Sequence, residues 1–173
     1  MNRRCEKILE ILGDETGPVT ATTLAEEMGV SRQVIVGDVA LLRASGYEIT
    51  ATSRGYTFSG SSPEADFAYI GTVACQHDFH QMKEELYTIV DFGGTVIDVA
   101  VEHAVYGELS GVLNISSRFE VDEFMRLVQE EENSAPICSL TGGIHIHRIG
   151  CKSRENFDRI NDELVKKGIA LNG

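Results

Sequence analysis

The run from Gly142 to His147 reads GGIHIH and places two histidines two residues apart in a segment typical of a β-strand. Side chains at positions i and i+2 of a strand point to the same face, so the two imidazoles stand about 6–7 Å apart at their Cβ atoms. Both rings can therefore bind one metal ion. Two surface histidines would give the same motif, so the rest of the chain has to decide between these interpretations.

Further histidines lie at the ends of other predicted strands. His77 closes the strand predicted around residues 68–75, and His103 ends the strand predicted over residues 95–102. Glu85 follows His77 by eight residues, on the helix predicted next, and can add a carboxylate. We therefore predict a metal site made of His77, Glu85, His145 and His147. Three imidazole nitrogens and one carboxylate suit a divalent ion such as Zn, Ni, Fe or Mn, and the ligand types do not choose among these.

Two other residues are candidate ligands of the same site. His80 competes with Glu85 for the position on the helix, and Cys75, two residues before His77, shares its face of the strand. These alternatives remain open at the level of the sequence.

A second group of residues suits contact with an anionic small molecule. His103 and Tyr106 flank the turn that Gly107 allows between two predicted strands, and Arg118 supplies a cation. We predict His103, Tyr106 and Arg118 as ligand-binding residues. A histidine bonded to the backbone of the turn and a solvated arginine are equally simple interpretations.

The N-terminal part carries the pattern of a DNA-binding module. Hydrophobic residues at helical spacing predict helices over residues 4–12, 21–28 and 31–44, and apolar and polar residues alternate on both sides of a Ser-Arg-Gly turn at residues 53–55. Helix, helix, helix and hairpin is the order of a winged helix-turn-helix, whose second motif helix presents its first residues to base edges.

The predicted recognition helix begins at Ser31. Arg32 can bond a guanine edge with two hydrogen bonds, and Gln33 an adenine edge. Arg54 at the hairpin tip can reach the DNA backbone or the minor groove. Arg43 near the helix end is either a phosphate contact or a solvated charge at the helix end. We predict Ser31, Arg32, Gln33, Arg43 and Arg54 as DNA-binding residues. Gly37 lies inside this helix, where glycine costs about 1 kcal/mol relative to alanine.

The C-terminal part reads as a second domain. Strands are predicted at residues 68–75, 95–102, 109–116 and 144–149, with helices at 81–90, 121–131 and 153–167. This βαββαβ order with one terminal helix is ferredoxin-like. A composition break at Ser59–Pro63 separates the parts. We therefore predict an α+β protein, with a winged helix-turn-helix over residues 1–60 and a ferredoxin-like domain over residues 64–173.

Composition limits the function further. The 173 residues carry a formal charge of −12, yet residues 1–60 hold 6 basic and 8 acidic residues, whereas residues 61–173 hold 9 and 19. DNA binding must therefore belong to the N-terminal part.

No run approaches the roughly 20 apolar residues of a membrane span, and the N-terminus lacks the apolar core of a signal peptide. The four cysteines form no pair motif, so we expect reduced thiols in the cytoplasm.

The sequence resembles the niacin-responsive bacterial transcription repressors, which join a helix-turn-helix to a three-histidine (3H) domain. The motifs that carry the resemblance are SRQVIV at 31–36 with Asp38, ATSRGY at 51–56, IVD at 89–91 before a glycine pair, DV at 98–99, Glu102-His103, Val105-Tyr106-Gly107, and LTGGIHIH at 140–147. The resemblance covers nearly the whole chain. It implies a cytoplasmic, homodimeric repressor of niacin uptake or NAD synthesis genes, with operator DNA and nicotinic acid as partners and a divalent transition metal in the 3H domain.

The family's metal ligands fall on His77, Glu85, His145 and His147. Ala104 stands where family members generally have proline, and Gly37 where they have a polar residue. Two other functions use similar residues: a metal-sensing repressor without an organic ligand, and a metal-dependent enzyme. No convincing general acid or base stands beside the predicted ligands, so we expect no enzyme.

Overall fold

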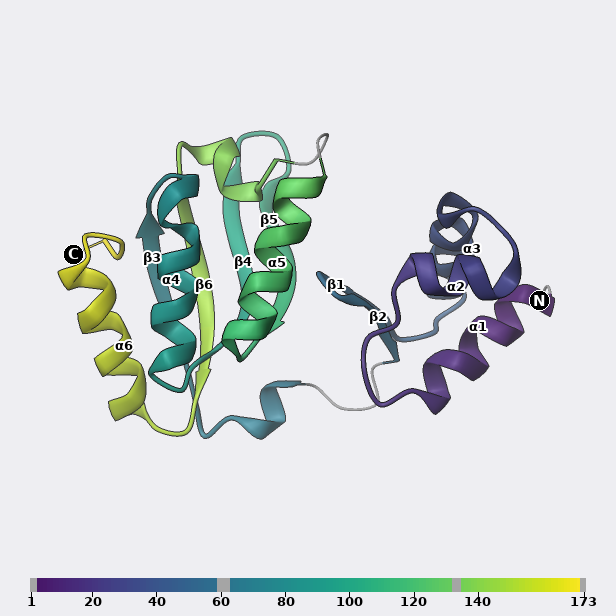
Figure 1. The fold of residues 1–173 in the computed structure, drawn as a ribbon, viewed down its shortest axis with the longest axis horizontal. Coiled ribbons are helices and arrows are strands. Elements are labelled where there is room, and N and C mark those ends of the chain that lie inside the picture. The colour runs from purple at the N-terminus through teal and green to yellow at the C-terminus, as the bar shows by residue number, and fades with distance from the viewer. Residues whose placement is uncertain (1–2, 59–62, 132–134, 172–173) are drawn as a thin grey trace. The chain divides into compact units, whose positions relative to one another are not determined.

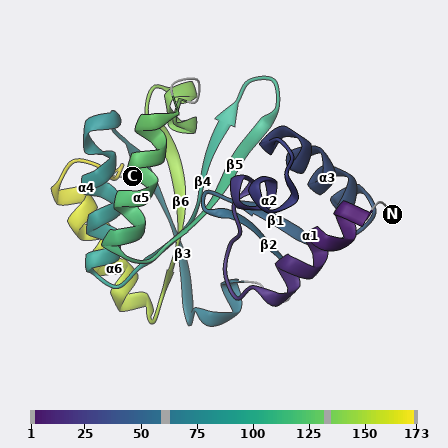
Figure 2. The same ribbon diagram turned by 45° about the vertical axis from the view of Figure 1, so that its right-hand side comes forward.

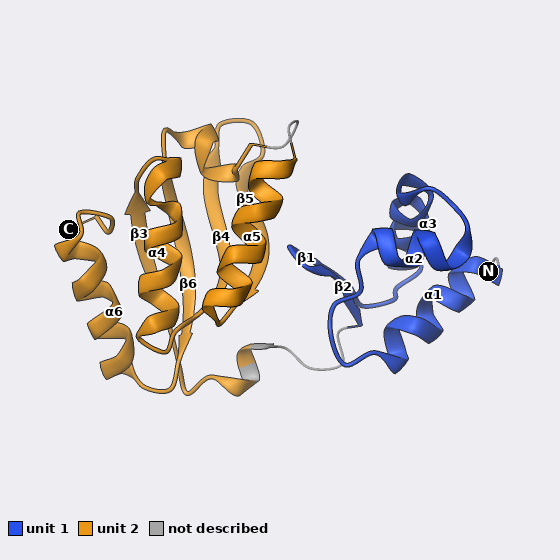
Figure 3. Ribbon diagram, in the orientation of Figure 1, with its two compact units in different colours: residues 1–62 blue, residues 63–173 orange. Residues whose placement is uncertain are grey.

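The computed structural model describes residues 3–58, 63–131 and 135–171. The chain forms two compact units, residues 1–62 and 63–173 (Figure 3). The break that we predicted at Ser59–Pro63 falls largely on residues 59–62, which lie outside the described residues. Among the helices of the described ranges, none has the length and apolar character needed to cross a bilayer.

Unit 1 has the predicted element order (Figure 1). Its elements are α1 (Arg3–Asp14), α2 (Ala21–Met28), α3 (Arg32–Ala44), β1 (Ile49–Thr52) and β2 (Gly55–Phe58). Thr20 caps α2 by accepting a hydrogen bond from the Thr23 amide at 3.0 Å, and Ser31 caps α3 by accepting one from the Val34 amide at 3.4 Å. Gly29 ends α2 in the left-handed conformation, with φ of 64°. The three predicted helices are thus confirmed, with α1 extending from residue 3 to residue 14 where residues 4–12 were predicted.

The core of unit 1 brings the three helices together. Its fully buried aliphatic side chains include Ile8, Leu24 and Ile35, with Leu12, Val39 and Leu42 beside them. At the edge of this core the Arg4 guanidinium of α1 makes a bidentate pair with the buried Asp38 carboxylate of α3. Helix α3 is therefore held against α1 by apolar packing and by a charged pair.

Unit 2 follows the predicted βαββαβα order, with two short 3₁₀ segments added. Its elements are η1 (Pro63–Asp66), β3 (Tyr69–Gln76), α4 (Phe79–Asp91), β4 (Thr95–His103), β5 (Gly107–Ile115), α5 (Arg118–Glu130), η2 (Ile137–Thr141), β6 (Ile144–Cys151) and α6 (Arg154–Lys166). Asp78, Ser117 and Ser153 cap the three α-helices through side-chain oxygens. The α+β architecture expected from the sequence is confirmed.

The strands of unit 2 form an antiparallel sheet in the order β5-β4-β6-β3. The last strand, β6, therefore lies between β3 and β4, so His147 pairs with Val73 on one side and with Val99 on the other. Helices α4, α5 and α6 cover the same face of this sheet (Figures 1 and 2). The strand order is what brings the histidines of β6 into the middle of the sheet.

Burial along β6 alternates with the pleat. His145, His147 and Ile149 are buried under the helices, whereas Ile144 and Ile146 on the opposite face are 46% and 40% exposed. The apolar core around them includes Val73, Leu86, Ile89, Ile115, Ile160 and Leu164. The two histidines thus occupy positions that a strand of this kind usually gives to hydrophobic residues.

Candidate metal centre

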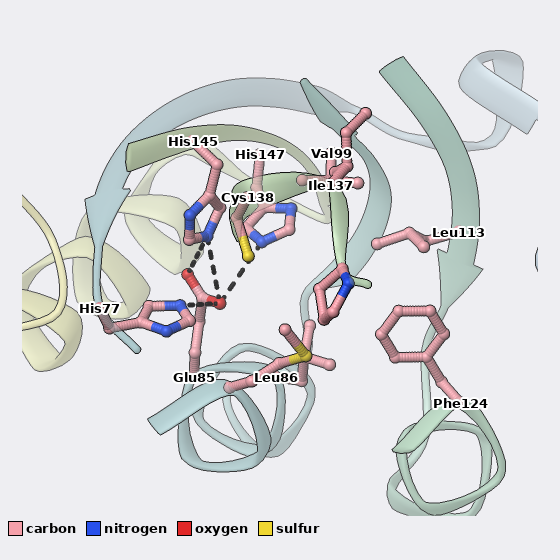
Figure 4. Close-up of a pocket in the computed structure, with 12 residues that line it drawn as sticks. His77, Glu85, Leu86, Val99, Leu113, Phe124, Ile137, Cys138, His145 and His147 are labelled. Carbon is pink, nitrogen blue, oxygen red and sulfur yellow. Dashed lines mark hydrogen bonds and ion pairs between the residues drawn. The ribbon is translucent and has the colours of Figure 1, made fainter. Parts of the chain in front are cut away.

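The four predicted ligands meet inside unit 2, around the carboxylate of Glu85 (Figure 4). Glu85 Oε2 lies 2.6 Å from His77 Nε2 and 3.4 Å from His147 Nε2, and Glu85 Oε1 lies 3.1 Å from His145 Nε2. Glu85 comes from the buried face of α4, His77 from the end of β3, and the other two from β6. Each of the four residues is at most 6% exposed.

The other nitrogen of each ring is fixed by the backbone. The Nδ1 atoms of His77, His145 and His147 lie 2.7, 2.8 and 2.7 Å from the carbonyl oxygens of Asp78, Gly143 and Asp98. A carbonyl oxygen only accepts, so each Nδ1 donates its proton and each Nε2 is the atom presented to the centre. This arrangement of outer hydrogen bonds is typical of histidines that bind metals.

Electrostatics couples the rings to the carboxylate. Burial by itself raises the pKa of Glu85, but the charge of His147 and the hydrogen bonds from the three histidines together hold it well below its usual range. Burial opposes protonation of His77 and His147, and Glu85 overcomes this effect, so the pKa values of both imidazoles are raised. The Glu85 carboxylate and the imidazoles of His77 and His147 therefore favour each other's charged forms.

The donor set fits a divalent transition ion. Three Nε2 atoms and one carboxylate converge in a buried site, and this is a donor set that such ions accept. Cys75 joins the same cluster: its sulfur, a Glu85 oxygen and a His145 nitrogen all lie within 4.8 Å of one another. His80, the alternative to Glu85, is exposed on the first turn of α4.

A small apolar cavity of about 50 Å³ adjoins the cluster. Besides the metal-site residues, its walls are Met82, Leu86, Val99, Leu113, Phe124, Pro136, Ile137 and Cys138 (Figure 4). A second, more open pocket of about 290 Å³ shares His77, Met82, Pro136 and Cys138 with it. The segment Pro136–Cys138 therefore borders both spaces.

The residues that we predicted as ligand contacts lie elsewhere in unit 2. His103 and Tyr106 stack on each other at the β4–β5 turn, with ring centroids 5.1 Å apart, and His103 Nδ1 accepts from the backbone of that turn. Arg118 makes a bidentate ion pair with Asp91 on the surface. These three residues do not line the cavity beside the histidines. Their contact with a ligand stays a prediction.

The predicted DNA-binding residues all belong to unit 1. Ser31, Arg32, Gln33 and Arg43 are exposed at the start and end of α3, and Arg54 is half-buried in the β1–β2 turn. Arg32 and Gln33 stand on the first turn of the helix, and Gln33 lies on the side opposite the buried Ile35 and Leu42. The helix thus presents its first turn outward, as a recognition helix does.

The sequence did not single out the groups that orient the rings or line the cavity. Gly143 illustrates why: its φ is 90°, and a Cβ there would overlap the backbone carbonyl of His77. Glycine allows the β6 backbone to approach His77, and its carbonyl accepts from both the His77 amide at 3.4 Å and His145 Nδ1. The glycine pair before the HxH motif was the available signal. No such signal marked Leu113 and Phe124, because hydrophobic residues are common at core positions of strands and helices.

Comparisons with known proteins agree with the two units. The 3H domain family matches residues 70–173, and a helix-turn-helix domain family matches residues 4–57. The chain is 43% identical over 168 residues to the probable transcription repressor NiaR of Thermotoga maritima, covering 97% of this chain and 93% of that protein. It is 36% identical over 170 residues to the transcription repressor NadR of Bacillus subtilis, covering 98% and 93%. The chain therefore belongs to the family of NiaR-like transcription repressors, in which a DNA-binding helix-turn-helix precedes a 3H domain, and not to the metal-dependent enzymes.

Proposed function

We propose that this repressor controls genes of niacin uptake or NAD synthesis in the cytoplasm, with nicotinic acid as corepressor and a divalent transition metal in the 3H domain. The observation that carries the proposal is the convergence of three Nε2 atoms on Glu85 beside an apolar cavity. Nicotinic acid has both a flat apolar ring and metal-binding groups, so this combination matches its chemistry.

His77, Glu85, His145 and His147 would hold the metal. Their Nδ1 atoms are already bonded to carbonyl oxygens, so the Nε2 atoms need no reorientation. A divalent metal held by these residues would supply a Lewis acid for the carboxylate or the pyridine nitrogen of the ligand. The chain's own part is to orient the nitrogens and to keep water away from them.

The cavity would take the pyridine ring between Leu113, Val99 and Phe124. Its volume of about 50 Å³ is below the roughly 150 Å³ of a cavity that binds benzene. We therefore expect Pro136–Cys138, which borders both pockets, to shift when the ring enters. Such a shift would couple ligand binding to the shape of unit 2.

The recognition helix α3 would read the operator. Arg32 and Gln33 would contact base edges, while Arg43, Arg54 and the Ser31 region would contact phosphates. A homodimer would place two α3 helices on half-sites separated by one helical turn of DNA or a multiple of it. The ligand would then act by favouring the domain arrangement that matches this spacing.

Fluorescence anisotropy of the metal-loaded protein tests the proposal, with DNA from upstream of its own operon. Nicotinic acid should tighten binding at least about tenfold, and nicotinamide should have little effect. The His145→Ala variant should lose metal and the nicotinic acid response together. His80→Ala, exposed on the first turn of α4 outside the cluster, is the matched control and should keep both.

Other outcomes would assign the protein differently. Operator binding that depends on metal but is unaffected by nicotinic acid would indicate a metal-sensing repressor. A nicotinic acid response that survives His145→Ala would separate the corepressor from the metal centre and contradict the proposed site.

A further inference from the structure

Cys75 places a sulfur atom at the candidate metal centre. It lies opposite His145 in the register between β3 and β6, so both side chains face the helices, and Cys75 is fully buried. Its sulfur, a Glu85 oxygen and a His145 ring nitrogen lie within 4.8 Å of one another. Ligand atoms that share one ion at 2.0–2.3 Å stand no more than about 4.6 Å apart, so the observed separations are close to those of a common coordination sphere.

We propose that Cys75 is a further ligand of the metal and that it makes the site select ions that accept sulfur. The inference rests on the proposed metal centre, but not on the identity of the corepressor. The donor set becomes three imidazoles, one carboxylate and one thiolate. Zn²⁺, Ni²⁺ and Co²⁺ accept such a set readily, whereas Mn²⁺ prefers oxygen ligands.

Metal binding to Cys75 releases the proton of its thiol. The S–H bond of Cys75 breaks, its proton leaves to solvent, and the sulfur donates an electron pair to the ion. No oxidant or reductant takes part. Cys75 has one alternative role: its thiol could stay protonated, donate a hydrogen bond to Glu85 and orient the carboxylate. The two roles differ in whether a sulfur–metal bond exists.

Two cysteines outside the cavity provide internal controls. Cys5 is buried in unit 1, and Cys151 is buried at the far end of β6. Neither belongs to the cluster formed by Cys75, Glu85 and His145. Replacing either one should leave the metal-binding set of Cys75 intact.

Cobalt spectroscopy of the metal-free, full-length protein tests the proposal. Titration with Co²⁺ should produce visible d–d bands and a near-ultraviolet sulfur-to-cobalt charge-transfer band. Cys75→Ser and Cys75→Val should lose the charge-transfer band and keep d–d bands, which would show that the histidine site is still formed. Cys5→Ser and Cys151→Ser should keep both. Absence of the charge-transfer band in the unaltered protein, or its persistence in both Cys75 variants, would overturn the proposal.

Metal competition gives a second readout. Cys75→Val should weaken Zn²⁺ binding at least about tenfold and change Mn²⁺ binding by less than about threefold. Equal effects on the two ions would contradict a sulfur ligand. The nicotinic acid response of operator binding, measured separately in the unaltered protein, tests the proposed function, so each idea can fail without the other.

Discussion

Single residues decide the electrostatics of the metal centre. Glu85 is 1% exposed, and an isolated carboxylate would not stay ionised at that depth. Three imidazoles supply its partners, and each ring is in turn bonded to a backbone carbonyl. The site is therefore organised before a metal arrives, because the three rings that face the carboxylate are already oriented.

The metal-free cluster should give the protein a characteristic pH dependence. Folding lowers the pKa of Glu85, so its contribution to stability is present above the usual value near 4.3 and is lost as the pH falls through the lowered value. Folding raises the pKa values of His77 and His147, so their contribution is present below about 6.5 and is lost as the pH rises through the raised values. Urea unfolding of the chelator-treated protein should therefore show its largest stability advantage over Glu85→Gln between about pH 4.3 and 6.5. An advantage independent of pH would contradict this account.

Gly37 offers a stability test within the recognition helix. Among the described residues, nothing outside the helix backbone and its chain neighbours lies within 4 Å of the position that a Cβ would take. Gly37→Ala should therefore raise the free energy of unfolding of unit 1 by about 1 kcal/mol, as measured by urea denaturation. Gly46→Ala is the contrasting control, because φ of 93° at Gly46 makes an alanine strained there. Destabilisation by Gly37→Ala would show that the helix interior does not accept the methyl group.

At the scale of elements, the start of β6 decides how the histidines are placed. Gly142 and Gly143 both have positive φ, of 63° and 90°, but only at Gly143 would a Cβ overlap His77. Alanine at either position costs roughly 1–2 kcal/mol of stability, because L-residues avoid this conformation. Gly143→Ala should in addition displace His77 and weaken metal binding at least about tenfold, measured by competition with a chelator. Equal metal affinity of the two variants would show that His77 does not depend on this close approach.

At the scale of the whole molecule, the chain holds two cores that share no residue. Metal should stabilise only the unit that binds it, by mass action. Calorimetry should therefore show two unfolding transitions. Zn²⁺ should raise the midpoint temperature of the transition of residues 63–173 only. Asp38→Ala should lower the midpoint temperature of the transition of unit 1 only, because it leaves Arg4 without its buried partner. A single transition that shifts as a whole in both experiments would show that the units unfold as one.

Much of the fold could be predicted from local patterns. The caps at Thr20 and Ser31, the stop at Gly29 and the hairpin at Ser53–Gly55 are local events, since each depends on residues within a few positions. The βαββαβα order followed from hydrophobic periodicity in the same way. The strand order did not, because periodicity shows that β6 has a buried face but not which strands pair with it.

The sequence by itself determined which residues can bind a metal and that two histidines share a face of β6, because residue chemistry and the pleat are local properties. The predicted end of a strand and the helix after it added His77 and Glu85, and the resemblance to a known family pointed to the same four residues. Only the tertiary structure decided that all four meet at one buried carboxylate, that three backbone carbonyls orient the rings, and that Cys75 and an apolar cavity lie beside them. Several of these contacts join residues 60 or more positions apart, as between Glu85 and His145. They depend on the insertion of β6 between β3 and β4, which long-range packing selects and no local pattern encodes.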